Sequence, residues 1–184
     1  MEYFAKLGCL LIDHGTEGLR KYFQNHILCG QTPQQFFTTN KTDIDDLRHG
    51  RHGCKRLINK RQYDLIFPAN NQPPNLKVFD ITLTFLLIRQ FQVGNTRPND
   101  PVWNDPAKAA GAPQDMQDII LLKFERNSLA HRESTDITPS EFEQKWTTIS
   151  SAVMRLEVLT TEEIQGKFLI KYASYVATWM RWKC

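Results

Sequence analysis

The residues best suited to chemistry in this sequence are Arg126, Asn127 and His131, at the end of the apolar run 119–131. An arginine guanidinium is always charged and offers a planar fork of donors that matches a phosphate. A histidine imidazole can take or give a proton near neutral pH. The Asn127 amide can orient the imidazole or donate to the phosphate. Together these side chains suit phosphodiester chemistry.

The run that carries these residues is predicted to be a buried helix, because it is long enough and contains no Gly or Pro. Apolar residues nearly surround its axis, which is typical of a central core helix. On such a helix Asn127 and His131 share a face, whereas Arg126 and His131 point about 140° apart. This divergence favours a site at a junction that a second copy of the chain completes.

The same residues also have a purely structural explanation. Arg and His at this spacing occur by chance in many helices. Both side chains also suit the C-terminal end of a helix, where the backbone dipole favours positive charge. Spacing alone therefore favours a structural role over a catalytic one.

The composition indicates one ordinary domain, or a domain with an appended helix, because the chain has 184 residues of which 41% are hydrophobic. The net charge of +3 permits contact with nucleic acid without requiring it. The cysteines form no Cys-x-x-Cys pair, which favours reduced intracellular thiols. They are Cys9, Cys29, Cys54 and Cys184. We expect a cytoplasmic protein with no signal peptide and no membrane span.

The most basic stretch runs from residue 48 to residue 61, and its two glycines predict a loop. Its cations are Arg48, Arg51, Lys55, Arg56, Lys60 and Arg61. Lys and Arg give sequence-independent affinity for a nucleic-acid backbone, so the stretch is a candidate RNA-binding loop. A solvated surface loop is the alternative. His49, His52 and Cys54 lack a fourth ligand at a familiar spacing, so we expect no metal site and no cofactor.

Apolar periodicity predicts helices over residues 3–28 and 34–48, and a buried helix after Asp80, which is a suitable N-cap. Gly15 and Gly18 lie in the first of these helices and suggest a close helix crossing. Pro and Gly residues predict a long irregular loop over 94–114, which Trp103 would anchor in the core.

Two helices are predicted to end the sequence. Thr138 is a candidate N-cap, with a Pro at the first helical position and Glu141 at the third, and apolar residues then recur at 4-3-4-3 spacing. A second capping pattern at Thr160 begins a helix whose aromatic face favours packing over a binding platform. Because Cys184 ends the chain inside that pattern, we expect a piece of a longer protein. The predicted boundaries are a domain over 1–157 and a C-terminal amphipathic helix over 158–184.

Several segments in this order resemble the HEPN superfamily (higher eukaryotes and prokaryotes nucleotide-binding). Within it, the chain resembles the HEPN-like domain named after the DAZ-interacting zinc-finger ubiquitin ligase. The resemblance spans roughly residues 3 to 157, and the segments that carry it are 3–7, 15–20, 62–68, 79–89, 126–131 and 142–146.

This resemblance implies an all-α helical bundle that forms a homodimer with the Arg…His helices at its interface. It also implies a metal-independent endoribonuclease. In that scheme His131 is the acid or base, Arg126 stabilises the charge on the phosphate, and Asn127 orients His131 or the phosphate. The products would be a 2′,3′-cyclic phosphate and a 5′-hydroxyl. Related domains also occur in large innate-immunity or ubiquitin-ligase proteins, so a catalytically silent interaction module is the alternative.

Overall fold

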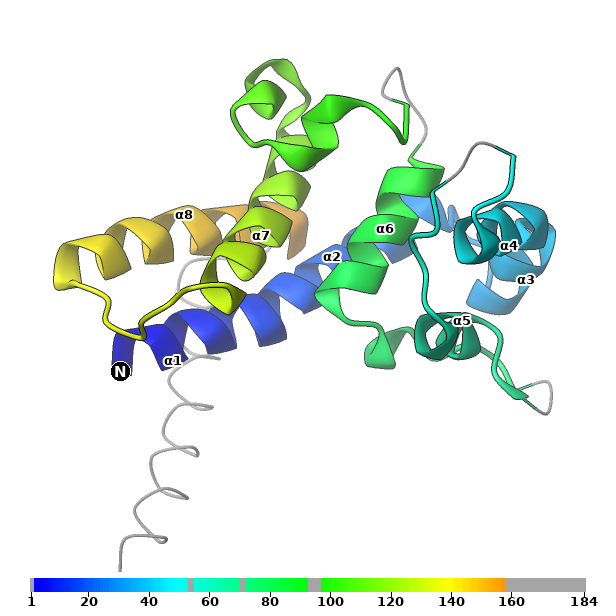
Figure 1. The fold of residues 1–184 in the computed structure, drawn as a ribbon, viewed down its shortest axis with the longest axis horizontal. Coiled ribbons are helices and arrows are strands. Elements are labelled where there is room, and N and C mark those ends of the chain that lie inside the picture. The colour runs from blue at the N-terminus through cyan, green and yellow to red at the C-terminus, as the bar shows by residue number, and fades with distance from the viewer. Residues whose placement is uncertain (1, 53–54, 70–71, 93–96, 158–184) are drawn as a thin grey trace, which may run out of the picture. The chain divides into compact units, whose positions relative to one another are not determined.

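The computed structural model describes residues 2–52, 55–69, 72–92 and 97–157, and within these ranges the chain forms helices and loops without any strand (Figure 1). The predicted all-α fold is therefore confirmed. In chain order the elements are α1 (Glu2–Cys9), η1 (Leu10–Gly15), α2 (Thr16–Tyr22), η2 (Phe23–Ile27), α3 (Pro33–Thr39), α4 (Lys41–His49), α5 (Lys60–Ile66), η4 (Leu76–Val78), α6 (Ile81–Phe91), η5 (Pro101–Asn104), η6 (Lys108–Gly111), α7 (Gln114–Ala130) and α8 (Pro139–Glu157).

The chain divides into two compact units. The first comprises residues 1–18 and 104–184, and the second comprises residues 19–103. The helix predicted over 158–184 lies outside the described residues. The predicted boundary near residue 157 coincides with the end of those residues and stays a prediction.

The first unit packs α1, η1, α7 and α8 against one another. Its core consists of Leu7, Leu10, Leu11, Met116, Ile119, Ile120, Leu122, Ile149, Ala152, Val153 and Leu156. A Cβ on Gly18 would lie 3.6 Å from the Leu156 Cβ and 3.5 Å from the Glu157 Cγ. The predicted close helix crossing is therefore confirmed at Gly18, where a larger side chain would meet α8.

The second unit has an aromatic core in which Phe37 stacks on Phe23 and lies 6.0 Å from Phe79. The predicted helix after Asp80 is confirmed as α6, because the Asp80 carboxylate accepts the Leu83 backbone N–H at 2.7 Å. Arg20 adds a tie by donating its Nε–H to the Phe79 carbonyl at 2.9 Å. The start of α6 is thus held by two side chains, one from its own N-cap and one from α2.

Trp103 anchors the long connection after α6, as predicted. Its side chain is fully buried, meets Phe85 edge to face at 5.9 Å, and donates its indole N–H to the Arg97 carbonyl at 3.1 Å. The connection is less irregular than predicted, because it contains the short helical turns η5 and η6.

The helix predicted over residues 34–48 is two helices, α3 and α4, separated at Asn40. The Asn40 side chain donates to the Phe36 carbonyl at 2.8 Å and so completes the end of α3. Asparagine competes with the backbone for such bonds and favours helix ends over helix interiors. The apolar spacing continues across this break, so periodicity alone predicted one helix in place of two.

Candidate functional site

Arg126 and Asn127 lie on the last turns of α7, and both are partly exposed. The Arg126 Nη1 donates to the Asn127 Oδ1 at 3.2 Å. This bond uses one of the five guanidinium N–H groups. Arg126 therefore keeps several donors that can reach a phosphate.

The backbone continues the helical bonding pattern from Asn127 to His131, as expected for two residues that share a helical face. The helix ends at Ala130, and His131 is its exposed C-cap, with its backbone N–H bonded to the Asn127 carbonyl at 3.0 Å. The next residue, Arg132, bonds to groups of the following loop and of α8.

Burial along α7 also differs from the prediction of a helix surrounded by core. Ile119, Ile120 and Leu122 are buried, but residues 123–130 are all partly or fully exposed, and Phe124 is 46% exposed. Only one face of this part of α7 packs on α1, η1 and α8. Arg126, Asn127 and His131 therefore all lie on an accessible end of the helix.

The loop after α7 is held by Arg132. Its Nε donates to the Ser134 carbonyl at 3.0 Å, and one Nη donates to the Asp136 carbonyl at 2.8 Å. The guanidinium also forms a two-pronged ion pair with the Glu141 carboxylate, at 2.5 and 3.0 Å. This network fixes the course of the chain immediately after His131.

Thr138 caps α8 as predicted, since its hydroxyl accepts the Glu141 backbone N–H at 3.2 Å. The Glu141 carboxylate bonds to Arg132, which was not predicted. Sequence analysis thus missed both partners of this ion pair. The available signal was an arginine directly after the motif, nine residues before an acid at a helix start.

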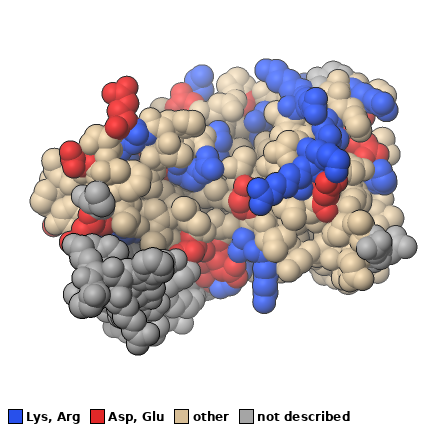
Figure 2. All heavy atoms as spheres, turned by 60° about the horizontal axis from the view of Figure 1, so that its bottom comes forward, with Lys and Arg blue, Asp and Glu red and all other residues tan. Residues whose placement is uncertain are grey.

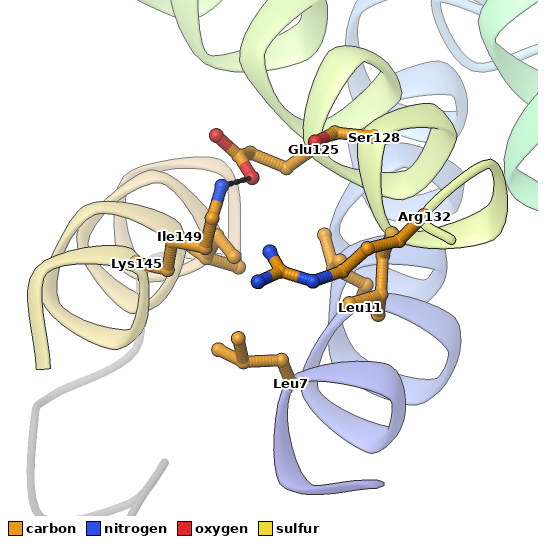
Figure 3. Close-up of a pocket in the computed structure, with 8 residues that line it drawn as sticks. Leu7, Leu11, Glu125, Ser128, Arg132, Lys145 and Ile149 are labelled. Atoms are coloured by element: carbon orange, nitrogen blue, oxygen red, sulfur yellow. Dashed lines mark hydrogen bonds and ion pairs between the residues drawn. The ribbon is translucent and has the colours of Figure 1, made fainter. Parts of the chain in front are cut away.

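Figure 3 shows a second ion pair close by, in which the Lys145 Nζ lies 2.6 Å from the Glu125 Oε2. Lys145 and Arg132 border a cavity of about 10 Å³, which has room for about one water molecule. Leu7, Leu11 and Ile149 supply apolar walls to this cavity. Arg126, Asn127 and His131 do not line it, so it is a packing gap and not a substrate pocket.

Glu141 should make stability depend on pH. The hydrogen bond from Arg132 holds the Glu141 pKa below its usual value of 4.5. A carboxylate whose pKa is depressed in the folded state stabilises the fold above that usual value and loses the effect as pH falls through its folded pKa. We expect Glu141→Gln to lower the urea midpoint at pH 7, and wild type and variant to converge below pH 4.5. Glu143→Gln, on an exposed residue of the same helix, is the matched control. If the urea midpoint of Glu141→Gln stayed below that of wild type in acid, the stabilisation would not come from the ionised Glu141 carboxylate.

The basic stretch 48–61 is only partly a loop, which corrects the prediction. Arg48 lies in the last turn of α4, while Lys60 and Arg61 open α5. Gly50 ends α4 in the left-handed region, at φ 71°, where glycine avoids the strain that a side chain would bring.

All six predicted cations of the stretch are accessible. Arg48 is partly exposed, and Arg51, Lys55, Arg56, Lys60 and Arg61 are exposed. Lys60 pairs with Asp64 at 2.7 Å, a weak surface bridge. On the face in Figure 2, blue Lys and Arg side chains gather on the right of the view. The second unit therefore offers accessible positive charge over the ends of α4 and α5.

His52 bonds to α4, and Cys54, the third candidate metal ligand of this stretch, lies outside the described residues. The His52 Nδ1 lies 2.8 Å from the Asp46 Oδ2, and the Asp46 side chain is only 12% exposed. The Asp46 carbonyl also accepts the Gly50 and Arg51 N–H groups. Within the described part of the chain, no three His, Cys, Asp or Glu side chains are placed to bind a metal ion together. Nor is any described helix long and apolar enough to cross a bilayer.

Residues 30–169 match the family model described as DZIP3/hRUL138-like HEPN. The match contains the basic stretch and the whole of α7, but begins after the first long helical segment and extends past the described residues. No curated protein and no solved structure gives a match.

Proposed function

Because the chain belongs to the DZIP3/hRUL138-like HEPN family, we propose that it binds RNA and cleaves it without a metal ion. The observation that supports this proposal best is the placement of Arg126, Asn127 and His131 at one accessible end of α7. These groups can supply both a proton-transfer agent and a fixed positive charge. Cleavage by the ribose 2′-hydroxyl needs both a group that transfers protons and a positive charge beside the phosphate.

In the proposed reaction His131 accepts the proton of the 2′-hydroxyl, and the resulting oxygen attacks the neighbouring phosphorus. The bond from phosphorus to the 5′-oxygen breaks, and that oxygen leaves as a hydroxyl by taking up the proton that His131 had accepted. Arg126 stabilises the charge that develops on the phosphate, an effect worth about 3 kcal/mol when donors are already in place. Asn127, bonded to Arg126, orients the guanidinium.

We propose that the active form is a homodimer in which the ends of two α7 helices meet. Phe124, at 46% exposure, is one of the large apolar side chains on the surface, and it lies three residues before Asn127 on the same face of α7. A second copy would cover this surface and exclude water from the reacting groups. Water exclusion strengthens electrostatic stabilisation of the phosphate.

A catalytically silent dimerisation module is the second candidate, and a specific contact favours it. The Arg126 guanidinium already bonds to the neighbouring Asn127, and Arg126 lies just before the last turn of α7, on the C-terminal half of the helix that the helix dipole makes favourable for positive charge. In this case the same apolar surface mediates interaction without turnover. In either case we place the domain in the cytoplasm, within a longer innate-immunity or ubiquitin-ligase protein.

The basic stretch is proposed to bind the RNA backbone. We expect the double variant Arg51→Ala/Arg56→Ala to weaken binding of every single-stranded RNA sequence to a similar degree. The slope of log affinity against log salt should fall by about 1 for each phosphate that the variant no longer neutralises. Lys77→Ala/Lys108→Ala removes two exposed cations elsewhere and is the control. Fluorescence anisotropy over a salt series measures both the affinity and its salt slope. Equal slopes for the two double variants would show that the basic stretch does not bind the RNA backbone.

The proposed activity is tested with labelled single-stranded RNA in the presence of a metal chelator. A 2′,3′-cyclic phosphate product would support the ribonuclease. An intact substrate with a dimeric protein would support the silent module. A chain that remains strictly monomeric at tens of micromolar in sedimentation would count against both candidates.

A further inference from the structure

A second, larger cavity lies within the second unit. Its volume is about 90 Å³, several times the space that one water needs. α6 contributes Leu86, Arg89 and Gln90 to its lining. Lys55 and Asn99, which are exposed, also line it, so the cavity opens to solvent.

Arg89 brings an uncompensated positive charge to this cavity. Its side chain is partly buried, and its Nε donates to the Pro98 carbonyl. Burial lowers the pKa of Arg89, with no carboxylate acting against that effect. Among the described residues, no acceptor bonds to the other four guanidinium N–H groups. A cation that is partly removed from water and lacks a counter-charge is costly, which favours the entry of an anion.

The rest of the lining is also suited to an anion. Lys55 adds a second positive charge, and the Gln90 and Asn99 amides add neutral donors. None of the described residues that line the cavity is acidic. Leu47 and Leu57 form part of the wall, and apolar walls strengthen the attraction between opposite charges by excluding water.

We propose that this cavity binds a phosphate group. The guanidinium fork matches two phosphate oxygens, and an ammonium group contributes a compact second charge. The cavity has room for a tetrahedral oxyanion. The proposal does not depend on RNA cleavage, because the cavity lies in the second unit and contains no residue of the Arg126–His131 motif.

The phosphate can be free or belong to a nucleotide, and the test separates these two sources. Isothermal titration of the whole chain is carried out with inorganic phosphate, with a 5′-phosphorylated dinucleotide and with the same dinucleotide bearing a 5′-hydroxyl, all at one ionic strength. Tighter binding of the phosphorylated dinucleotide than of inorganic phosphate identifies a nucleotide phosphate. Binding of inorganic phosphate alone identifies the free ion.

Variants decide whether the binding occurs at this cavity. Lys55 is exposed, so Lys55→Ala should fold normally and weaken phosphate binding by about 10-fold, the usual effect of losing one charge-assisted hydrogen bond. Arg89→Gln retains a donor for the Pro98 carbonyl and should abolish detectable binding. Lys77→Ala, an exposed cation of the same unit that does not line the cavity, should bind as wild type does. Absence of saturable binding to wild type, or equal affinities for Lys55→Ala and Lys77→Ala, would overturn the proposal.

Discussion

Replacing His131 with alanine is expected to slow RNA cleavage by about 100- to 10,000-fold, the usual contribution of a general acid or base. The side chain is exposed, and the described residues offer it no bonded partner, so its removal should leave the fold intact. Initial cleavage rates under single-turnover conditions measure the effect. His26→Ala is the matched control, because His26 is also exposed near the end of a helical segment but stacks on Tyr22, away from the motif.

Variants of Arg126 test the second group of the proposed reaction. Arg126→Ala should lower the maximal rate by about 100- to 1,000-fold, the cost of removing a group that stabilises the transition state. Arg126→Lys retains the charge but loses the planar fork, so it should recover part of that rate and not all of it. Cleavage at the wild-type rate by both the His131 and the Arg126 variants would identify a contaminating nuclease and end the catalytic proposal.

Residues that act on their near neighbours in sequence were well predicted. The Asp80 carboxylate caps α6 and the Thr138 hydroxyl caps α8, and each bond spans three residues. Such bonds depend on local sequence alone, so a single chain reveals them. The buried residues Ile149, Val153 and Leu156 also follow the predicted spacing, because α8 presents one regular face to the core.

Features that depend on distant partners were not predicted. The ion pair that Arg132, just after α7, makes with Glu141 joins residues nine positions apart and has no local sequence signature. Apolar spacing likewise predicted a buried α7 from end to end, but burial depends on which faces the neighbouring helices cover. The exposure of Phe124 could therefore only be learned from the packing.

In the candidate sites, too, local features were predicted and features that depend on distant residues were not. Arg126, Asn127 and His131 were identified by residue type and spacing, and so were the cations of the basic stretch. Arg89 was assigned to a buried helix, and its role at a cavity was missed. Its partner Lys55 lies more than 30 residues away in the sequence, and no spacing rule connects a loop lysine to a helical arginine at that separation.

Removing Arg155 should destabilise the first unit more than any surface substitution. Its Nη2 and Nε lie 2.7 and 2.8 Å from the two carboxylate oxygens of Asp118, which is 1% exposed. The Asp118 carboxylate raises the Arg155 pKa through these bonds. In Arg155→Met the buried carboxylate keeps, among the residues that the structure describes, the bond from the Gln114 amide at 3.1 Å. The loss should be about 3 kcal/mol, since a buried charge left without its partner is costly.

Replacing Asp118 should cost less stability than replacing Arg155, because the two partners differ in exposure. The Arg155 side chain is 46% exposed and can turn to water once Asp118 is changed. We therefore expect Asp118→Asn to lower the free energy of unfolding by about 1 kcal/mol, since a neutral amide still bonds. The double variant Asp118→Leu/Arg155→Met removes both charges and should recover most of the loss, because a well-packed apolar pair replaces a buried ion pair at little cost.

Urea unfolding of these variants measures all three values. Arg61→Met is the control, since Arg61 is exposed and forms no ion pair among the described residues. It should stay within about 0.5 kcal/mol of wild type. Equal losses for Arg155→Met and Asp118→Asn would show that the carboxylate does not depend on its partner. The contact between α7 and α8 would then rest mainly on buried apolar residues such as Ile119, Ile149 and Val153, together with the ion pair between Lys145 and Glu125.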